Sequence, residues 1–225
     1  MLWHERQGSG PDLVLVHGWG LHGGIWGDLP ARLAEHFRVT TLDLPGHGRS
    51  RTAGESLSLS AFTDCVVELC PAPAIWLGWS LGGLIALNAA LRHPRKVARL
   101  VLVGATPKFV QAPDWPYAMP TEVFADFAHS LSQDYRATLL RFLSLQAGGN
   151  ESARALLKQL RAEMFAHGEP QPEALAAGLA ILEQTDLRAR PSWGLKRRRC
   201  TRRPVSCRRS AGSVTPTPGR GISSW

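Results

Sequence analysis

Residues 74–83, Ala-Ile-Trp-Leu-Gly-Trp-Ser-Leu-Gly-Gly, decide the fold of this 225-residue chain. An apolar run of strand length leads into a Gly-x-Ser-x-Gly motif centred on Ser80, and residues 84–91 read as a helix that His93-Pro94 ends. Glycines two positions before and after the serine remove side chains that would clash with the adjoining strand and helix. The stretch predicts a nucleophile elbow with an exposed Ser80 hydroxyl. An ordinary glycine-rich turn is the alternative, and the flanking strand and helix patterns disfavour it.

Strands and helices alternate on both sides of this motif. Short apolar runs predict strands at residues 13–16, 39–44 and 99–105, with an edge strand at 3–6. Helical patterns cover residues 25–37 and 59–70, the second capped by Ser58 or Ser60. This alternation predicts a doubly wound, mostly parallel α/β sheet.

Residues 108–186 break the alternation. Four helical segments are expected there, at residues 123–131, 136–145, 152–165 and 172–184. Helices inserted after a strand predict a cap over the carboxyl edge of the sheet, which excludes water and shapes a substrate pocket. The expected organisation is therefore a core at residues 1–107, a helical cap at 108–186 and a basic tail at 187–225.

His17-Gly18-Trp19-Gly20 directly follows the strand at residues 13–16, where a glycine-rich loop can fold over the carboxyl edge. The backbone N–H groups of Trp19 and Leu81 are the predicted oxyanion donors. A plain strand-to-helix loop is the alternative.

Three polar residues near these loops are predicted to be structural: His17, Asp43 and His47. The glycine-rich residues 45–50 lack the Gly-Lys-Ser/Thr sequence of a phosphate cradle, which disfavours phosphate binding.

Two cap segments suggest contacts with ligands. Residues 142–146 would present apolar side chains and an amide to the pocket, although plain helix packing is equally open for Leu143 and Leu145. Arg154, Lys158 and Arg161 share one helix face, and Arg136 and Arg141 lie on the preceding helix. These basic residues either dock an acidic partner or form a solvated surface.

The net charge of +8 conceals two different regions. Residues 1–187 contain 15 basic residues against all 18 acidic ones, whereas residues 188–225 contain 11 basic residues and no acidic one.

The composition is that of an ordinary globular domain, with no membrane-length apolar run and no signal-like start. We expect a cytoplasmic protein. The four cysteines include no CxxC pair, and we expect no metal site and no cofactor.

Three motifs together resemble the α/β-hydrolase-fold esterases: residues 17–20, 43–50 and 78–83. Four segments narrow the resemblance to the carboxylesterases that act on pimeloyl-acyl-carrier-protein methyl ester in biotin synthesis, namely residues 76–84, 114–116, 141–146 and 185–188. The resemblance runs from about residue 2 to residue 188.

This resemblance implies an α/β-hydrolase fold and a role for each motif. Ser80 would attack the methyl ester of a pimeloyl chain on acyl carrier protein, and Trp19 and Leu81 would bind the ester oxygen through backbone N–H groups. The acyl channel would be lined by Phe142, Leu143, Ser144, Leu145 and Gln146. The carrier protein would dock on Arg136, Arg141, Arg154 and Lys158. A monomer is expected.

The chain departs from this family after Leu187. The family order is Ser, then Asp, then His, yet no Asp or Glu follows Asp186 and no His follows His167. His129 and His167 lie in the expected cap, which disfavours them as substitutes. Serine is a weak nucleophile without a base, and loss of the base costs about a million-fold in kcat in subtilisin. We therefore expect impaired catalysis.

The tail has a composition typical of disorder. The expectation is a truncation or a shifted reading frame after about residue 189, with the C-terminal strands absent and the strand at 99–105 left with an uncovered edge.

Three other functions stay open: a non-catalytic protein that binds acyl carrier protein or another ligand, a general serine esterase or lipase, and nucleic-acid binding by the basic tail. The tail has no interleaved aromatic residues except Trp193 before its end, which disfavours nucleic acid.

Overall fold

A computed structural model describes residues 2–52, 57–70, 73–146, 162–164 and 166–188. The chain divides into two compact units, Met1–Arg190 and Pro191–Trp225, and all described residues belong to the first unit. The predicted helix at 152–165 lies largely outside the described residues.

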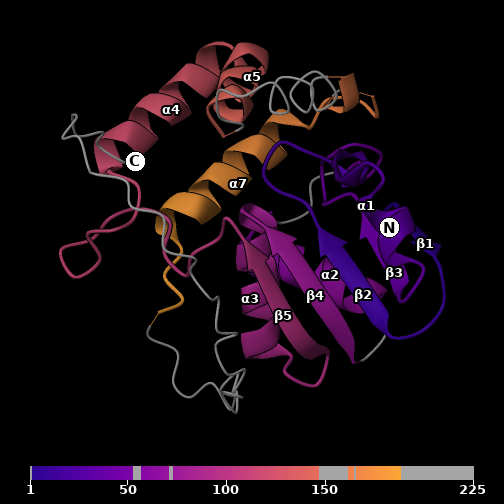
Figure 1. Cartoon of the computed structure of the whole chain (residues 1–225). Helices are drawn as coiled ribbons and strands as arrows, with labels where there is room; N and C mark the ends of the chain where they lie inside the picture. The colour runs from indigo at the N-terminus through magenta and orange to yellow at the C-terminus, as the bar shows by residue number, and fades with distance from the viewer. Residues whose placement is uncertain (1, 53–56, 71–72, 147–161, 165, 189–225) are drawn as a thin grey trace, which may run out of the picture. The chain divides into compact units, whose positions relative to one another are not determined.

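The first unit contains a five-stranded sheet with the order β1-β3-β2-β4-β5 (Figure 1). Its strands are β1 (His4–Gln7), β2 (Asp12–Val16), β3 (Arg38–Leu42), β4 (Ala74–Trp79) and β5 (Val97–Val103). β1 pairs antiparallel with β3, and the other neighbours are parallel. The predicted edge strand and the mostly parallel sheet are both confirmed.

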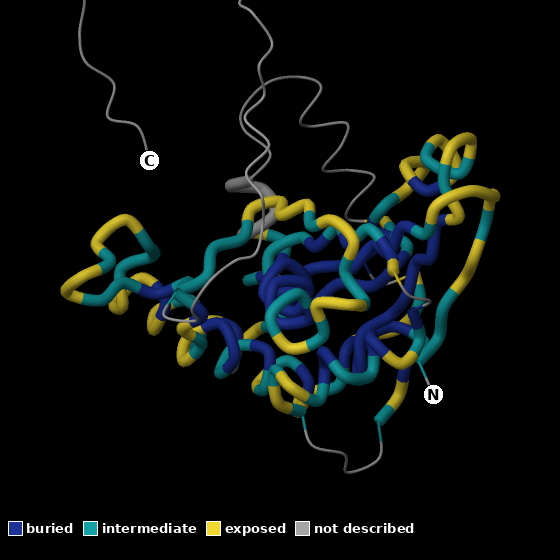
Figure 2. Tube along the Cα trace, turned by 90° about the horizontal axis from the view of Figure 1, so that it is seen from below, coloured by how far each residue is buried: buried dark blue, intermediate teal, exposed yellow. Residues whose placement is uncertain are grey.

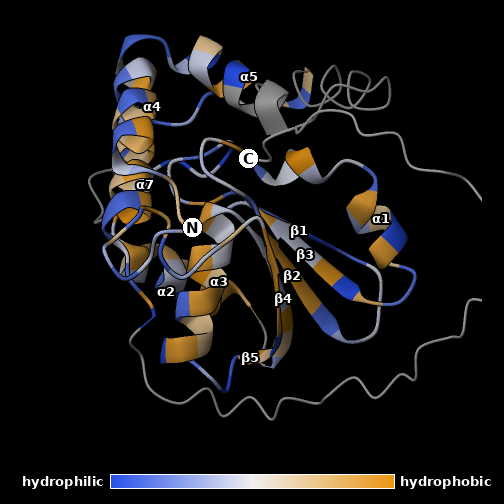
Figure 3. Cartoon of the chain, turned by 60° about the vertical axis from the view of Figure 1, so that its left-hand side comes forward, coloured by the Kyte–Doolittle hydropathy of each residue, from blue (hydrophilic) through white to orange (hydrophobic). Residues whose placement is uncertain are grey.

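Burial follows the position of each strand in the sheet. Leu13–Val16 of β2 are 0–4% exposed, because a central parallel strand is covered on both faces. Figure 3 shows hydrophobic colouring along much of β2 and β4. β5 instead leaves Val101, Leu102 and Val103 exposed by 39–45%, and in the described part of the chain it pairs only with β4.

The helices of the core are η1 (Gly23–Trp26), α1 (Leu29–Leu33), α2 (Leu59–Leu69) and α3 (Leu81–Arg92). The single helix expected at residues 25–37 is wrong. Gly27, at φ 52°, breaks the chain direction, and a new short helix begins at Leu29, with Pro30 in its first turn. Ser58 caps α2, with its hydroxyl accepting from the N–H of Ala61, and α3 ends at His93 as predicted.

α3 is the central helix of the unit. All nine residues of Leu81–Ala89 are buried, because α3 packs against β2, β4, β5 and α2. A helix that is apolar on every side is stable only when covered in this way. The one polar residue among them, Asn88, donates to the hydroxyl of Thr63 at 2.9 Å. Figure 2 shows the buried interior beneath exposed loops.

Three cap helices lie at the carboxyl ends of the strands, α4 (Thr121–Gln133), α5 (Tyr135–Gln146) and α7 (Pro172–Gln184) (Figure 1). They correspond to three of the four predicted cap helices.

The two ends of the cap meet at one point, which we call the neck. Leu187 N–H donates to the carbonyl of Pro107 at 2.9 Å. Arg188 forms ion pairs with Asp186 at 2.7 Å and with Asp114 at 2.9 Å. The neck therefore joins two segments that the sequence resemblance singled out separately.

Two buried histidines support the loops at the carboxyl edge. His17 donates through Nδ1 to the carbonyl of Gly18 and accepts the N–H of Leu44 at Nε2. His47 donates through Nδ1 to the carbonyl of Pro45, and its buried Nε2 has no partner among the described residues. Burial lowers the pKa of His17 to about 3 and that of His47 to about 4. These contacts agree with the predicted structural role.

Acid should destabilise the fold through these histidines. Both are neutral when folded, and unfolding restores a pKa of about 6.5. Their contribution is complete above that pH and is lost as pH falls towards 4 and 3, by up to about 1.4 kcal/mol per pH unit for each histidine. His17→Gln keeps a donor and an acceptor, and we expect a shallower dependence of unfolding free energy on pH. The exposed His36→Gln is the control, and equal slopes in both variants would contradict the assignment.

Candidate active site

Ser80 lies between the end of β4 and the start of α3, with φ 53° and ψ −115°. It is the one non-glycine residue with positive φ in the described part of the chain. Such a conformation is strained for a serine and is kept only where the surroundings enforce it. The strand, the turn and the helix predicted around Ser80 are thus confirmed.

Three glycines allow the backbone to crowd around this turn. A Cβ atom on Gly78 would lie 2.3 Å from the carbonyl oxygen of Gly82. On Gly82 it would lie 2.2 Å from the carbonyl oxygen of Val16, and on Gly83 it would lie 2.3 Å from Cβ of Ala105. A side chain at any of these three positions would clash with a neighbouring segment, which explains why each is glycine.

The loop at residues 17–20 lies beside the serine. A Cβ atom on Gly18 would be 3.5 Å from Cβ of Ser80, and Trp19 follows directly. Leu81 is the first residue of α3, so its N–H has no acceptor within the helix and lies at the positive end of the helix dipole. The two predicted oxyanion residues thus come from the segments that flank Ser80.

Asp43 binds the backbone at Gly23, just after this loop. Its carboxylate accepts the N–H of Gly23 at 2.7 Å and forms an ion pair with Arg49 at 2.8 Å. Burial alone would raise the pKa of Asp43, but the hydrogen bonds from Arg49 and Gly23 outweigh it and the pKa is lowered. The loop is therefore anchored by a buried, ionised carboxylate.

The loop is also bonded to the cap. His22 accepts the N–H of Gly24 at Nδ1, and its Nε2 lies 2.7 Å from the carbonyl oxygen of Glu163, to which it donates. The ring of His22 also contacts that of His167 at 4.8 Å. Burial lowers the pKa of His22, which keeps its ring neutral and suited to both bonds.

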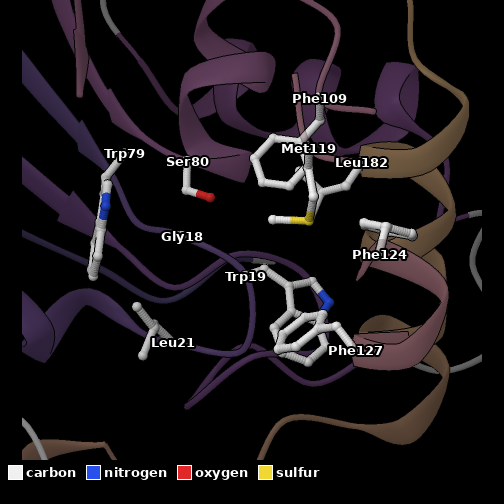
Figure 4. A pocket seen from close by; sticks show the side chains of 10 residues that line it. All are labelled: Gly18, Trp19, Leu21, Trp79, Ser80, Phe109, Met119, Phe124, Phe127 and Leu182. Atoms are coloured by element: carbon white, nitrogen blue, oxygen red, sulfur yellow. The ribbon is translucent and has the colours of Figure 1, made fainter. Parts of the chain in front are cut away.

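An apolar pocket opens directly on Ser80 (Figure 4). Its lining comprises Gly18, Trp19, Leu21, Trp79, Ser80, Phe109, Met119, Phe124, Phe127 and Leu182. None of these described residues is ionisable, so none of their side chains can act as a general base for the serine. The cavity measures about 30 Å³.

A second cavity of about 400 Å³ shares one wall with the first. Trp19 lines both, and the remaining walls come from α4, α7 and the residues on either side of them, including Leu131, Tyr135 and Leu175. The position of the Trp19 ring therefore affects the space on two sides.

The predicted lining of the pocket by residues 142–146 stays a prediction. Residues 142–146 belong to α5, but the side chains of Phe142, Leu143, Ser144, Leu145 and Gln146 lie outside what the structure describes. Among the described residues, five that the sequence analysis missed line the pocket: Phe109, Met119, Phe124, Phe127 and Leu182. The i, i+3 spacing of the two α4 phenylalanines indicated a buried helix face, without indicating that it faces Ser80.

The predicted docking residues are placed only in part. Arg136 and Arg141 are exposed on α5, and Arg136 forms an ion pair with Glu169. Arg154, Lys158 and Arg161 lie outside the described residues. Neither His129 nor His167 lines the pocket at Ser80.

Among the described residues, no group of three or more His, Cys, Asp or Glu could hold a metal ion. No helix there is both long and apolar enough to cross a membrane.

Residues 11–188 match the family described as the alpha/beta hydrolase fold, and the chain belongs to this family. It is 47% identical over 215 residues to the pimeloyl-[acyl-carrier protein] methyl ester esterase of Xanthomonas axonopodis pv. citri (strain 306), covering 93% of this chain and 84% of that protein. The protein of the same name from Stenotrophomonas maltophilia (strain R551-3) is 47% identical over 191 residues, covering 84% and 73%. The resemblance drawn from the motifs is confirmed.

A solved structure supports the fold independently. An esterase from Exiguobacterium antarcticum superposes with a TM-score of 0.67 at 24% identity, covering 82% of this chain and 70% of that one.

Replacing the glycine before the serine should destabilise the whole unit. Gly78→Ala places a methyl group 2.3 Å from a backbone oxygen, and we expect it to lower the unfolding free energy by about 3 kcal/mol. Urea denaturation measures the change. Gly18→Ala is the matched control, because its nearest neighbour would be 3.4 Å away and its φ is not positive. Equal stability of the two variants would show that crowding does not determine the turn.

Proposed function

We propose that this chain is a serine carboxylesterase of biotin biosynthesis that hydrolyses the methyl ester of pimeloyl-acyl-carrier protein. The observation that carries the proposal is Ser80 on a strained elbow, facing an apolar pocket, in a chain 47% identical to a protein of that name. A cytoplasmic monomer acting on the carrier-bound ester belongs to the same proposal.

The chemistry follows from the groups around the serine. The Ser80 hydroxyl oxygen attacks the ester carbonyl, and the developing oxyanion receives hydrogen bonds from the N–H groups of Trp19 and Leu81. Methanol leaves with the serine proton, and water then hydrolyses the acyl-enzyme to release the acid. The apolar lining accommodates the methylene chain.

Proton transfer is the weak step in this chain. No described residue that lines the pocket is ionisable, and the sequence has no histidine after His167. Oxyanion stabilisation and binding alone still accelerate hydrolysis by about 10³–10⁴-fold over water in subtilisin. We therefore propose slow turnover, in which the oxyanion donors supply most of the acceleration.

A second candidate is a protein that binds the carrier-bound ester without hydrolysing it. The observation that favours it is the same pocket lining, with a hydroxyl but no base.

Hydrolysis of pimeloyl-acyl-carrier-protein methyl ester distinguishes the two. We expect release of the free acid, measured by mass spectrometry, at a rate about 10⁶-fold below that of an esterase with a complete triad. Ser80→Ala should lower this rate at least about tenfold while ester binding persists. If the native chain and Ser80→Ala release the acid at equal rates and both bind the ester, the result favours the second candidate, a protein that binds without hydrolysing. If the native chain does not bind the carrier-bound ester, both candidates are rejected.

Docking of the carrier protein is proposed on the basic residues of the cap, Arg136, Arg141, Arg154 and Lys158. The support is the exposure of the Arg141 side chain on α5, where it can meet an acidic partner. Arg136 is engaged with Glu169, which makes Arg141 the better residue to test.

Reversal of the Arg141 charge should weaken carrier binding. We expect Arg141→Glu to raise the Kd for the acyl-carrier protein about threefold to tenfold at low salt, and less at high salt because exposed charges are screened. Surface plasmon resonance measures both. Arg95→Glu is the control, since Arg95 is exposed just before β5, at the opposite edge of the sheet. Equal effects of the two reversals would point to net charge instead of a docking site.

A further inference from the structure

Gly178 lies in the middle of the cap helix α7 and is buried. A glycine at such a position destabilises a helix relative to alanine, so its presence needs a reason. The reason is a close contact with the core. A Cβ atom on Gly178 would lie 2.5 Å from Cδ1 and 2.9 Å from Nε1 of Trp19, and 3.3 Å from Cδ2 of Leu81.

These two neighbours are the residues proposed to supply the oxyanion donors. One helical position therefore touches the side chains of both, although they belong to different segments on either side of Ser80. Leu81 is fully buried and Trp19 is 7% exposed, so both contacts are inside the protein.

The Trp19 ring has little freedom to move away. Its Nε1–H donates to the carbonyl of Leu175 on α7 at 2.9 Å. The ring of Phe127 on α4 packs edge-on against it, with centroids 6.0 Å apart (Figure 4). A methyl group on Gly178 would therefore shift either α7 or the loop that carries the Trp19 N–H.

The same face of α7 approaches the core at two further points. Ala174 lies one turn before Gly178. A Cβ atom on Gly46 would lie 2.4 Å from Cβ of Ala174. Leu182, one turn after Gly178, lines the pocket at Ser80. The i, i+4, i+8 spacing places these three residues on one stripe of the helix, with the small side chains where the helix approaches the loops.

We propose that Gly178 is a positioning residue for the oxyanion site: its lack of a side chain lets α7 seat against Trp19 and Leu81 and so fixes their N–H groups beside Ser80. This inference rests on the proposed function, because it assigns the two donors their catalytic role. It makes the cap helix part of the support of the reaction centre as well as a wall of the pocket.

The test is Gly178→Ala, with two readouts. The first is hydrolysis of p-nitrophenyl butyrate, an activated ester that depends little on a base. The second is the affinity for 1-butaneboronic acid, which forms a tetrahedral anion on a serine and needs no turnover. Loss of one oxyanion donor costs about 10²–10³ in kcat, so a displaced donor should lower kcat at least about tenfold. We expect a similar loss of boronate affinity and a KM within about twofold.

Two controls separate positioning from packing. Glu183→Ala changes an exposed residue of the same helix and should leave both readouts unchanged. Trp19→Ala removes the ring that Gly178 contacts, so adding Gly178→Ala to it should cause little further loss of kcat.

Three outcomes would overturn the inference. Unchanged kcat and boronate affinity in Gly178→Ala would do so, as would a native chain that binds no boronate. Thermal unfolding measures the folded fraction of Gly178→Ala. If kcat falls only in proportion to that fraction, Gly178 has a packing role and no positioning role. Failure of the pimeloyl ester assay alone would reject the proposed substrate and leave the positioning role intact.

Discussion

The approach of Gly82 to the carbonyl of Val16 is the constraint on which the rest of the structure depends. It brings the start of α3 against the end of β2, within a distance that no side chain would permit. The serine must then turn through a left-handed conformation, and the loop after β2 must pass over it. The position of Ser80 beside the pocket and that of the loop next to it both depend on this contact.

The charged pair of Asp43 and Arg49 does not line the pocket at Ser80. This ion pair of buried Asp43 with partly exposed Arg49 anchors the loop, while His17 and His47 remain neutral through burial. The pocket at Ser80 is correspondingly apolar. A reaction there would rely on fixed backbone dipoles, which need no ionisable neighbour and cost no reorganisation.

Local sequence patterns determined which parts of the fold could be predicted. The apolar runs of β2 and β4 and the crowded glycines around Ser80 carry their explanation within a few residues, and their structure agrees. The helix expected at residues 25–37 was wrong because its apolar spacing outweighed Gly27 and Pro30 in the prediction.

The remaining parts of the site depend on contacts between distant segments. Phe124 and Phe127 have the same pattern whether they face a core or a pocket, so their role at Ser80 had no local signal. Likewise, a glycine within α7 indicates a close neighbour but not that the neighbour is Trp19.

The neck has a consequence for how such a protein can change over evolution. Because Pro107 and Leu187 are hydrogen-bonded to each other, the chain enters the cap and leaves it at the same place. The cap is thus a single excursion between two adjacent points, and its length is not tied to the spacing of the strands. Segments could be lengthened, shortened or exchanged there without altering the register of the sheet, so the choice of substrate can diverge while the serine and its turn stay constant.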